Sequence, residues 1–224
     1  MGMSRCSPIG LIALLATGAC YGLFAVFVRE LAEVLSGHQQ VFLRQSFAVV
    51  FVLAALGVGG GARAVQARPL RGAPVAGFAV AYVVTITCFT FEVLHTSLAT
   101  AALGLYGGSM LGSMTLGRLF FREVVTGLKA VAIGCCLLGV VVTGVHGHGE
   151  EGALLGLGLG NLAGLGQAAA NACRRALAER WSRMALAGLQ GLAGMVLGGV
   201  LVVAANEALL PALTPWQWAL VACS

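Results

Sequence analysis

The chain has 224 residues, of which 59% are hydrophobic and only 9% are charged, against roughly 25% charged residues in a typical soluble domain. This composition excludes an ordinary soluble domain and predicts a protein embedded in a lipid bilayer. The formal net charge of +5 comes from basic residues scattered between apolar runs. That distribution excludes the basic patch with interleaved aromatic residues that a nucleic-acid partner would require.

Seven apolar runs, each long enough to cross a bilayer as a helix, follow one another along the chain. All five prolines lie outside these runs, where a missing backbone N–H is harmless. The first run is too long for the apolar core of a signal peptide and is expected to be retained. An eighth run begins at Trp216 and is too short to cross the hydrocarbon layer. The seven predicted helices are residues 9–28, 39–56, 75–93, 98–116, 128–145, 152–173 and 184–205.

The motif R-x-L-A-E-x-x-S occurs at residues 29–36 and again at 175–182, an offset of 146 residues. Each copy closes an apolar run, and one repeat period holds five runs. Because five is odd, the second copy is inverted across the membrane, as in many secondary transporters. The sequence therefore predicts an all-α polytopic membrane protein, a 5+5 inverted-repeat helical bundle with about seven and a half helices present.

The expected domains are a first repeat over residues 1–145 and an incomplete second repeat over residues 146–224. The eighth helix looks truncated, and helices 9 and 10 are missing, so the chain is expected to be a fragment or a shortened product. With a cytoplasmic N-terminus, eleven of the thirteen basic residues fall on the cytoplasmic side. We therefore expect a multi-pass protein of the cell inner membrane with its N-terminus in the cytoplasm.

Three phrases of the sequence carry a resemblance to a known family. They are Tyr21-Gly22 followed by Arg29-Glu30-Leu31, then Phe42-Leu43-Arg44, and Phe120-Phe121-Arg122-Glu123 with Gly127, Gly134 and Gly139. Together they resemble the EamA-type transporters of the drug/metabolite transporter superfamily, over nearly the whole chain. The resemblance implies ten helices in two inverted halves around a central cavity that moves small metabolites, often outward. Gly107 and Arg122 depart from the family pattern, which usually has Pro and Gly there.

Polar residues inside the apolar runs are the candidate substrate site. Arg44 and Glu92 are expected at matching depth near the outer face, where they can pair. A structural ion pair, substrate binding and proton coupling through Glu92 all stay open. Near the midplane the sequence offers uncharged groups, which suit a polar or zwitterionic molecule better than a bare cation. The candidate substrate-binding residues are Tyr21, Arg44, Glu92, Tyr106, Asn161 and Gln167.

Other motifs have structural interpretations. Glycines spaced by four residues predict close helix packing on the fourth and sixth helices, and Thr85 and Thr87 are expected to bond their own helix backbone. Glu123 is expected to order the start of the fifth helix. The loop His146-Gly-His148-Gly-Glu-Glu151 is expected to be a solvated turn and no metal site. Five of the seven cysteines lie in apolar runs, so we expect neither redox chemistry nor a cofactor.

These features predict a secondary transporter that exports a small polar metabolite, such as an amino acid or related compound, by alternating access. The alternative is a non-transporting scaffold or inactive remnant, since helices 9 and 10 are absent. We expect no enzyme, because Ser109 lies near the midplane while His95 lies near the outer surface. The expected partners are the lipid bilayer and the metabolite, with proton coupling and a homodimer left open and no nucleic acid.

Overall fold

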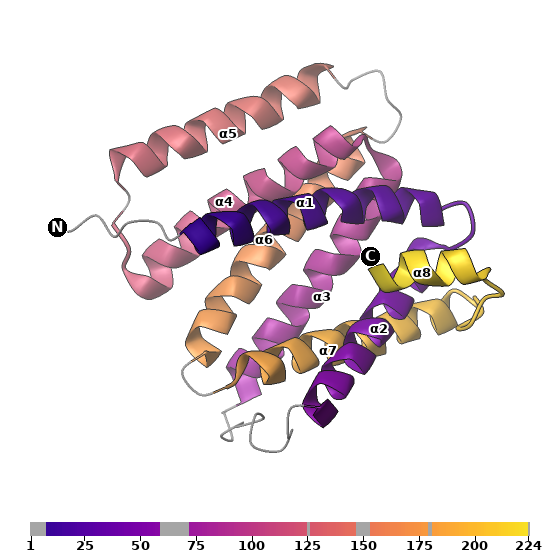
Figure 1. The fold of residues 1–224 in the computed structure, drawn as a ribbon. Coiled ribbons are helices and arrows are strands. Elements are labelled where there is room, and N and C mark those ends of the chain that lie inside the picture. The colour runs from indigo at the N-terminus through magenta and orange to yellow at the C-terminus, as the bar shows by residue number, and fades with distance from the viewer. Residues whose placement is uncertain (1–7, 59–71, 125, 147–152, 179–180, 224) are drawn as a thin grey trace.

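The computed structural model describes residues 8–58, 72–124, 126–146, 153–178 and 181–223. In these ranges every regular element is a helix (Figure 1). The helices are α1 (Pro8–Leu31), α2 (Gly37–Val58), α3 (Gly72–His95), α4 (Leu98–Phe121), α5 (Gly127–His146), α6 (Ala153–Leu177), α7 (Arg183–Ala204) and α8 (Pro215–Cys223). The predicted all-α fold class is therefore confirmed.

Three of the described helices are long and apolar enough to cross a membrane by length and composition, namely Gly37–Gly57, Gly72–His95 and Arg183–Ala204. The sequence predicted seven such spans. α4 and α6 have 24 and 25 residues, which also suffices in length. Both contain many glycines that face each other inside the bundle, which lowers their mean hydropathy. The protein is thus a polytopic helical membrane protein.

Serine hydroxyls set the start of three helices. Ser36 and Ser182, the last residues of the two motif copies, accept hydrogen bonds from the backbone N–H groups of Gln39 and Ala185, at 3.2 and 3.1 Å. Ser97 does the same at the start of α4. Each bond satisfies an N–H group that has no partner within its helix. The two copies of the motif therefore perform the same local task, which is to end one helix and begin the next.

The helices α2 and α7 occupy equivalent positions in the two repeats and pack antiparallel. Gly198 lies on Phe42, where an added Cβ would be 2.8 Å from the Phe42 Cα, and Gly188 lies on Val52 at 3.6 Å. An offset of 146 converts the first contact into the second, since it carries residue 42 to 188 and 52 to 198. A two-fold axis between two equivalent helices produces this reciprocal pattern.

Two buried clusters obey the same relation. One lies between α1, α2 and α8, and the other between α6, α7 and α3. Their members correspond through the 146-residue offset. In the first cluster they are Leu31, Leu35, Leu43 and Val221, and in the second Leu177, Trp181, Leu189 and Val75. The helices themselves pair accordingly, with α1 on α8 and α3 on α6. Because equivalent helices run in opposite directions, the repeat is inverted.

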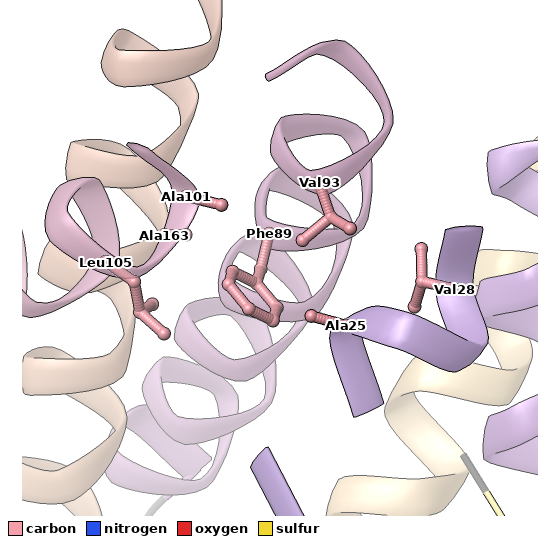
Figure 2. Packing of buried hydrophobic residues seen from close by; sticks show 7 residues of the cluster. All are labelled: Ala25, Val28, Phe89, Val93, Ala101, Leu105 and Ala163. Atoms are coloured by element: carbon pink, nitrogen blue, oxygen red, sulfur yellow. The ribbon is translucent and has the colours of Figure 1, made fainter. Parts of the chain in front are cut away.

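A third cluster joins α1, α3, α4 and α6 and forms the core beside the candidate site (Figure 2). Phe89 and Val93 project from α3 between α4 on one side and α1 on the other. The ring of Phe24 stacks on Phe89, with 5.5 Å between centroids. The helix α5 contacts mainly α4 and lies at the edge of the bundle (Figure 1).

Polar contacts join α2 to the segment after α7 at the end of the bundle that holds the α1–α2 turn, which we call the α1–α2 end. The hydroxyl of Ser36 donates to the Glu207 carboxylate. The ring of His38 lies 3.7 Å from that carboxylate, and the Gln39 side-chain amide donates to the Ala208 carbonyl at 2.9 Å. We call these the end contacts. They tie the α1–α2 turn and the start of α2 to the segment after α7.

Candidate functional site

A polar stripe runs along the buried face of α2. Gln40 and Arg44 are one turn apart, which places both on the same face of the helix, and they are 0% and 5% exposed. The Gln40 amide donates to the Val28 carbonyl at 3.1 Å and to the Leu35 carbonyl at 3.3 Å. It therefore satisfies backbone acceptors at the end of α1. The Gln40 side-chain oxygen accepts no hydrogen bond within the described ranges.

Arg44 lies where α1, α2 and α3 meet. Its Nε donates to the Gln40 carbonyl at 3.2 Å, and its Nη2 donates to the Thr90 hydroxyl at 2.7 Å. The guanidinium carbon lies 4.4 Å from the centroid of the Phe24 ring, a favourable cation–π geometry. Nη1 has no hydrogen-bond partner among the described residues. The site thus holds a buried cation with no carboxylate beside it and one free donor.

Glu92 lies on α3 where it meets α4 and α6, and it is fully buried. Its carboxyl group is placed between two glycines. A Cβ on Gly160 would come within 2.7 Å of Glu92 Oε2, and a Cβ on Gly104 would be 3.5 Å from Glu92 Cδ. Neither carboxyl oxygen accepts a hydrogen bond from any described residue. Glu92 therefore fills the space that the two missing side chains leave, without a polar partner.

Arg44 and Glu92 do not pair, although the sequence suggested that they could. Thr90, which accepts the Arg44 bond, precedes Glu92 by two residues on α3. Two residues rotate the side chain by about 200° around a helix, so Glu92 points to the opposite side of α3. The ion pair, one of the possibilities that the sequence left open, does not form because matching depth in the membrane does not place two residues on facing sides.

The uncharged candidates are not gathered in one place. Tyr106 is 54% exposed on α4, while Gly104 and Gly108 on the same helix are buried. Asn161 is half-buried, and its amide donates to the Leu157 carbonyl of its own helix at 2.8 Å. Gln167 is half-buried on the same helix.

The side chain of Tyr21 and the loop residues His148 and Glu151 lie outside the described residues. Thr85 donates to the Ala81 carbonyl at 2.8 Å, which confirms the expected bond to its own helix. The Thr87 hydroxyl instead has no partner within the described ranges. The buried ionisable side chains of Arg44 and Glu92 are therefore more unusual than the uncharged residues near the midplane.

Sequence reasoning missed the residues around Arg44. The Gln40 carbonyl and the Thr90 hydroxyl both accept hydrogen bonds from Arg44. On the same helix as Arg44, Gln45 accepts a hydrogen bond from the Tyr82 hydroxyl at 3.2 Å. The available signal was the spacing of Gln40 and Arg44, four residues apart in an apolar run. Polar residues on one face of a membrane helix mark the side that faces other helices.

At the opposite end, Glu123 and Arg175 form a salt bridge of 2.7 Å. Arg175 also lies over the Phe121 ring, 4.4 Å from its centroid. A depression of about 420 Å³ beside this bridge is lined by Arg118, Arg122, Glu123 and Val124. Both partners are substantially exposed, so the bridge ties α4 to α6 only weakly.

The glycine interface consists of Gly104, Gly108 and Gly112 on α4 with Gly160 and Gly164 on α6. A Cβ on Gly108 would be 2.8 Å from the Asn161 Cα, and a Cβ on Gly112 would be 2.7 Å from the Ala168 Cβ. These distances are shorter than real Cβ contacts, so the helices touch through their backbones. The predicted packing role of the glycine faces is confirmed.

The structure is thus a polytopic membrane bundle with an inverted repeat and two buried ionisable side chains, an arrangement that is typical of secondary transporters. The model of the EamA-like transporter family matches residues 8–145. The chain belongs to that family, whose members are transporters rather than enzymes, and is a membrane transporter of the drug/metabolite transporter superfamily. Searches of curated proteins and of solved structures gave no match.

Proposed function

We propose that this protein is a secondary transporter that exports a small carboxylate-bearing metabolite, such as an amino acid, across the cell inner membrane by alternating access. The single observation that carries the proposal is the guanidinium of Arg44. It is buried among helices, has one free donor and has no carboxylate within hydrogen-bond reach among the described residues.

A charge in this place is costly. An unpaired arginine at the centre of a membrane helix costs about 2.5–3.5 kcal/mol on insertion scales. Arg44 lies seven residues after the first residue of α2, about 10 Å from that end of the helix. This position away from the centre of the helix reduces that cost. The Phe24 ring and the Thr90 hydroxyl offset a further part. A substrate carboxylate would supply the missing negative charge, because the planar guanidinium matches the two oxygens of a carboxylate.

A second free group lies one turn away. The Gln40 side-chain oxygen is an unused acceptor, and it lies on the same face of α2 as Arg44. An unused donor and an unused acceptor at this spacing fit a molecule with a carboxylate at one end and an ammonium group at the other. Amino acids have this arrangement, which supports the choice of substrate class.

The two-fold relation between α2 and α7 supports alternating access. In inverted-repeat transporters, one repeat rocks against the other around a fixed site. The contacts between α2 and α7 are made largely by glycines, including Gly188, Gly194 and Gly198, which present flat surfaces. The end contacts hold the α1–α2 end closed, and their release would open the site to that side.

The proposed orientation rests on the distribution of basic residues. With the N-terminus in the cytoplasm, the α1–α2 end faces outward, and the salt bridge between Glu123 and Arg175 faces the cytoplasm. This orientation satisfies the positive-inside rule. Export then corresponds to release of the substrate after the end contacts of Ser36 and Glu207 break.

The proposal is tested by counterflow of radiolabelled amino acids in liposomes that contain the purified protein. Each amino acid is compared with its amide and with its decarboxylated amine. A charge-assisted hydrogen bond is worth about 1.5–3 kcal/mol, so we expect the carboxylate form to be preferred by roughly 10- to 100-fold. Arg44→Gln should abolish this preference.

The matched control is Arg118→Gln, which removes an exposed arginine and should leave the preference intact. Equal uptake of all three forms by the native protein would refute carboxylate recognition. A flat response across amino acids, amines, nucleobases and sugars would refute transport, and would favour the non-transporting scaffold.

A further inference from the structure

The carboxyl group of Glu92 has no room for a ligand beside it. The glycines on either side approach each other closely, since a Cβ on Gly104 would be 3.1 Å from the Gly160 Cα. The carboxyl group lies against both. Thr96, one turn later, packs on Gly156, where a Cβ would be 3.1 Å from the Thr96 Cβ. Neither a metabolite nor a hydrated metal ion fits between these backbones.

Among the described residues, no cation faces this carboxyl group from the helices around it. On α1, Arg29 donates to the carbonyls of the last residues of α3, and on α2, Arg44 lies on the opposite side of α3. On α3 itself, the His95 ring bonds the carbonyl one turn before it, and the thiol of Cys88 is one turn away from Glu92. In their described residues, the facing sides of α4 and α6 carry no titratable group.

The geometry points to Glu92 as a proton-binding site, with the proton as the coupling ion of the transport proposed above. A carboxylate ion enclosed by glycine backbones would lack any donor, and burying an unpaired charge is strongly unfavourable. A proton neutralises the group without occupying space. Glu92 therefore carries a proton while α3, α4 and α6 are packed as they are here.

Proton release then requires these helices to separate. The carboxylate must meet water when it forms, and water reaches it only if Thr96 leaves Gly156 and the glycine interface parts near Gly104 and Gly160. Glu92 lies three residues before the end of α3, so the nearest water is at the α1–α2 end. The proton is therefore exchanged with the side that the end contacts close, and proton movement is linked to the opening of that side.

The first experiment measures the proton directly and needs no substrate. Infrared spectra of the protein in lipid are recorded for the native chain and for Glu92→Gln, in H2O and in D2O. We expect a C=O band of a protonated carboxylic acid that shifts little in D2O and is lost in Glu92→Gln. The matched control is Glu33→Gln, which removes an exposed carboxylate just after α1. That variant should keep the band.

A native spectrum without this band, or a band that survives in Glu92→Gln, would overturn the assignment. Glu92→Asp provides a second variant that keeps a carboxyl group. We expect it to restore the band at a shifted frequency, because the shorter side chain places the group differently.

The second experiment separates coupling from transport. In liposomes, Glu92→Gln should keep substrate counterflow, which needs no net proton movement, and should lose accumulation driven by a pH gradient. Loss of both activities, or accumulation equal to that of the native protein, would refute the coupling role. Should the native protein transport no carboxylate substrate, the infrared result would still decide whether Glu92 holds a proton.

Discussion

The glycine interface can be tested with two glycine-to-alanine substitutions on α6. They differ in whether the new Cβ meets the backbone of α4. In Gly164→Ala, the new Cβ would lie 2.7 Å from the Gly108 carbonyl carbon and would approach two further backbone atoms of α4. In Gly158→Ala, the new Cβ would meet nothing within 4 Å. Both replace glycine by alanine inside α6, so both gain the same helix-forming preference, about 1 kcal/mol.

The cost of Gly164→Ala follows from the distances. Ordinary van der Waals contact begins at 3.4 Å, so the Cβ and the Gly108 carbonyl carbon must separate by a further 0.7 Å. Backbone atoms cannot rotate away as a side chain can, so α4 and α6 must move apart. A gap of that size removes roughly a quarter to a half of the attraction between the atoms that it separates. Overpacking of this kind costs about 1–3 kcal/mol.

We therefore expect Gly164→Ala to unfold more easily than Gly158→Ala by about 1–3 kcal/mol. The measurement is equilibrium unfolding in mixed micelles as the fraction of a denaturing detergent rises. The comparison cancels the helix-forming preference and isolates the contact between α4 and α6. Equal free energies of unfolding for the two variants would show that these helices do not touch at Gly164, and would contradict the packing on which the placement of Glu92 depends.

Three further predictions concern the repeat and the caps. Single cysteines introduced at Ala32 and Ala178 in a background without native cysteines should react with an impermeant maleimide from opposite sides of the membrane, and reaction from one side would contradict the inverted repeat. Ser182→Ala should lower the free energy of unfolding by about 1 kcal/mol because the first turn of α7 loses its cap, and a Ser182→Thr variant should retain most of it. Glu123→Gln should change the free energy of unfolding by less than about 1 kcal/mol, because its bridge to Arg175 is exposed; a larger loss would show that this bridge holds α4 against α6.

Much of the fold could be predicted from the sequence because the repeat and the helix signals are local. The motif at 29–36 and 175–182 places a leucine that is buried in both copies and a serine that caps the next helix in both. Four-residue spacing of glycines identifies a contact surface without reference to any other helix. Such features depend only on neighbours along the chain, so a reading of the sequence detects them.

The arrangement of the candidate site could not be predicted in the same way. The sequence gives the depth of Arg44 and Glu92 along their helices, but their pairing depends on the direction in which each side chain points. The direction of Tyr106 also could not be judged from its depth, but the glycine spacing on its helix carried the missing information. It is two residues from Gly104, hence about 200° around α4, so the packing of the glycine face already implied that Tyr106 faces away. The helix face on which each residue lies must therefore be compared before its depth in the membrane.

The helices of the two repeats follow a two-fold relation, but their charged residues do not. The equivalent of Arg44 in the second repeat is Gln190, which accepts a hydrogen bond of 3.0 Å from Arg174 near the end of α6. Within the described part of the chain a buried cation thus exists in one half only, and its counterpart in the other half, Gln190, is neutral. A site on the two-fold axis would treat both membrane faces alike. The proposed site is displaced toward the first repeat and would not, since the substrate carboxylate would meet Arg44 beside the end contacts and Glu92 would exchange its proton at the same end. If both steps use one exit, the opening of the α1–α2 end controls substrate release and proton exchange together.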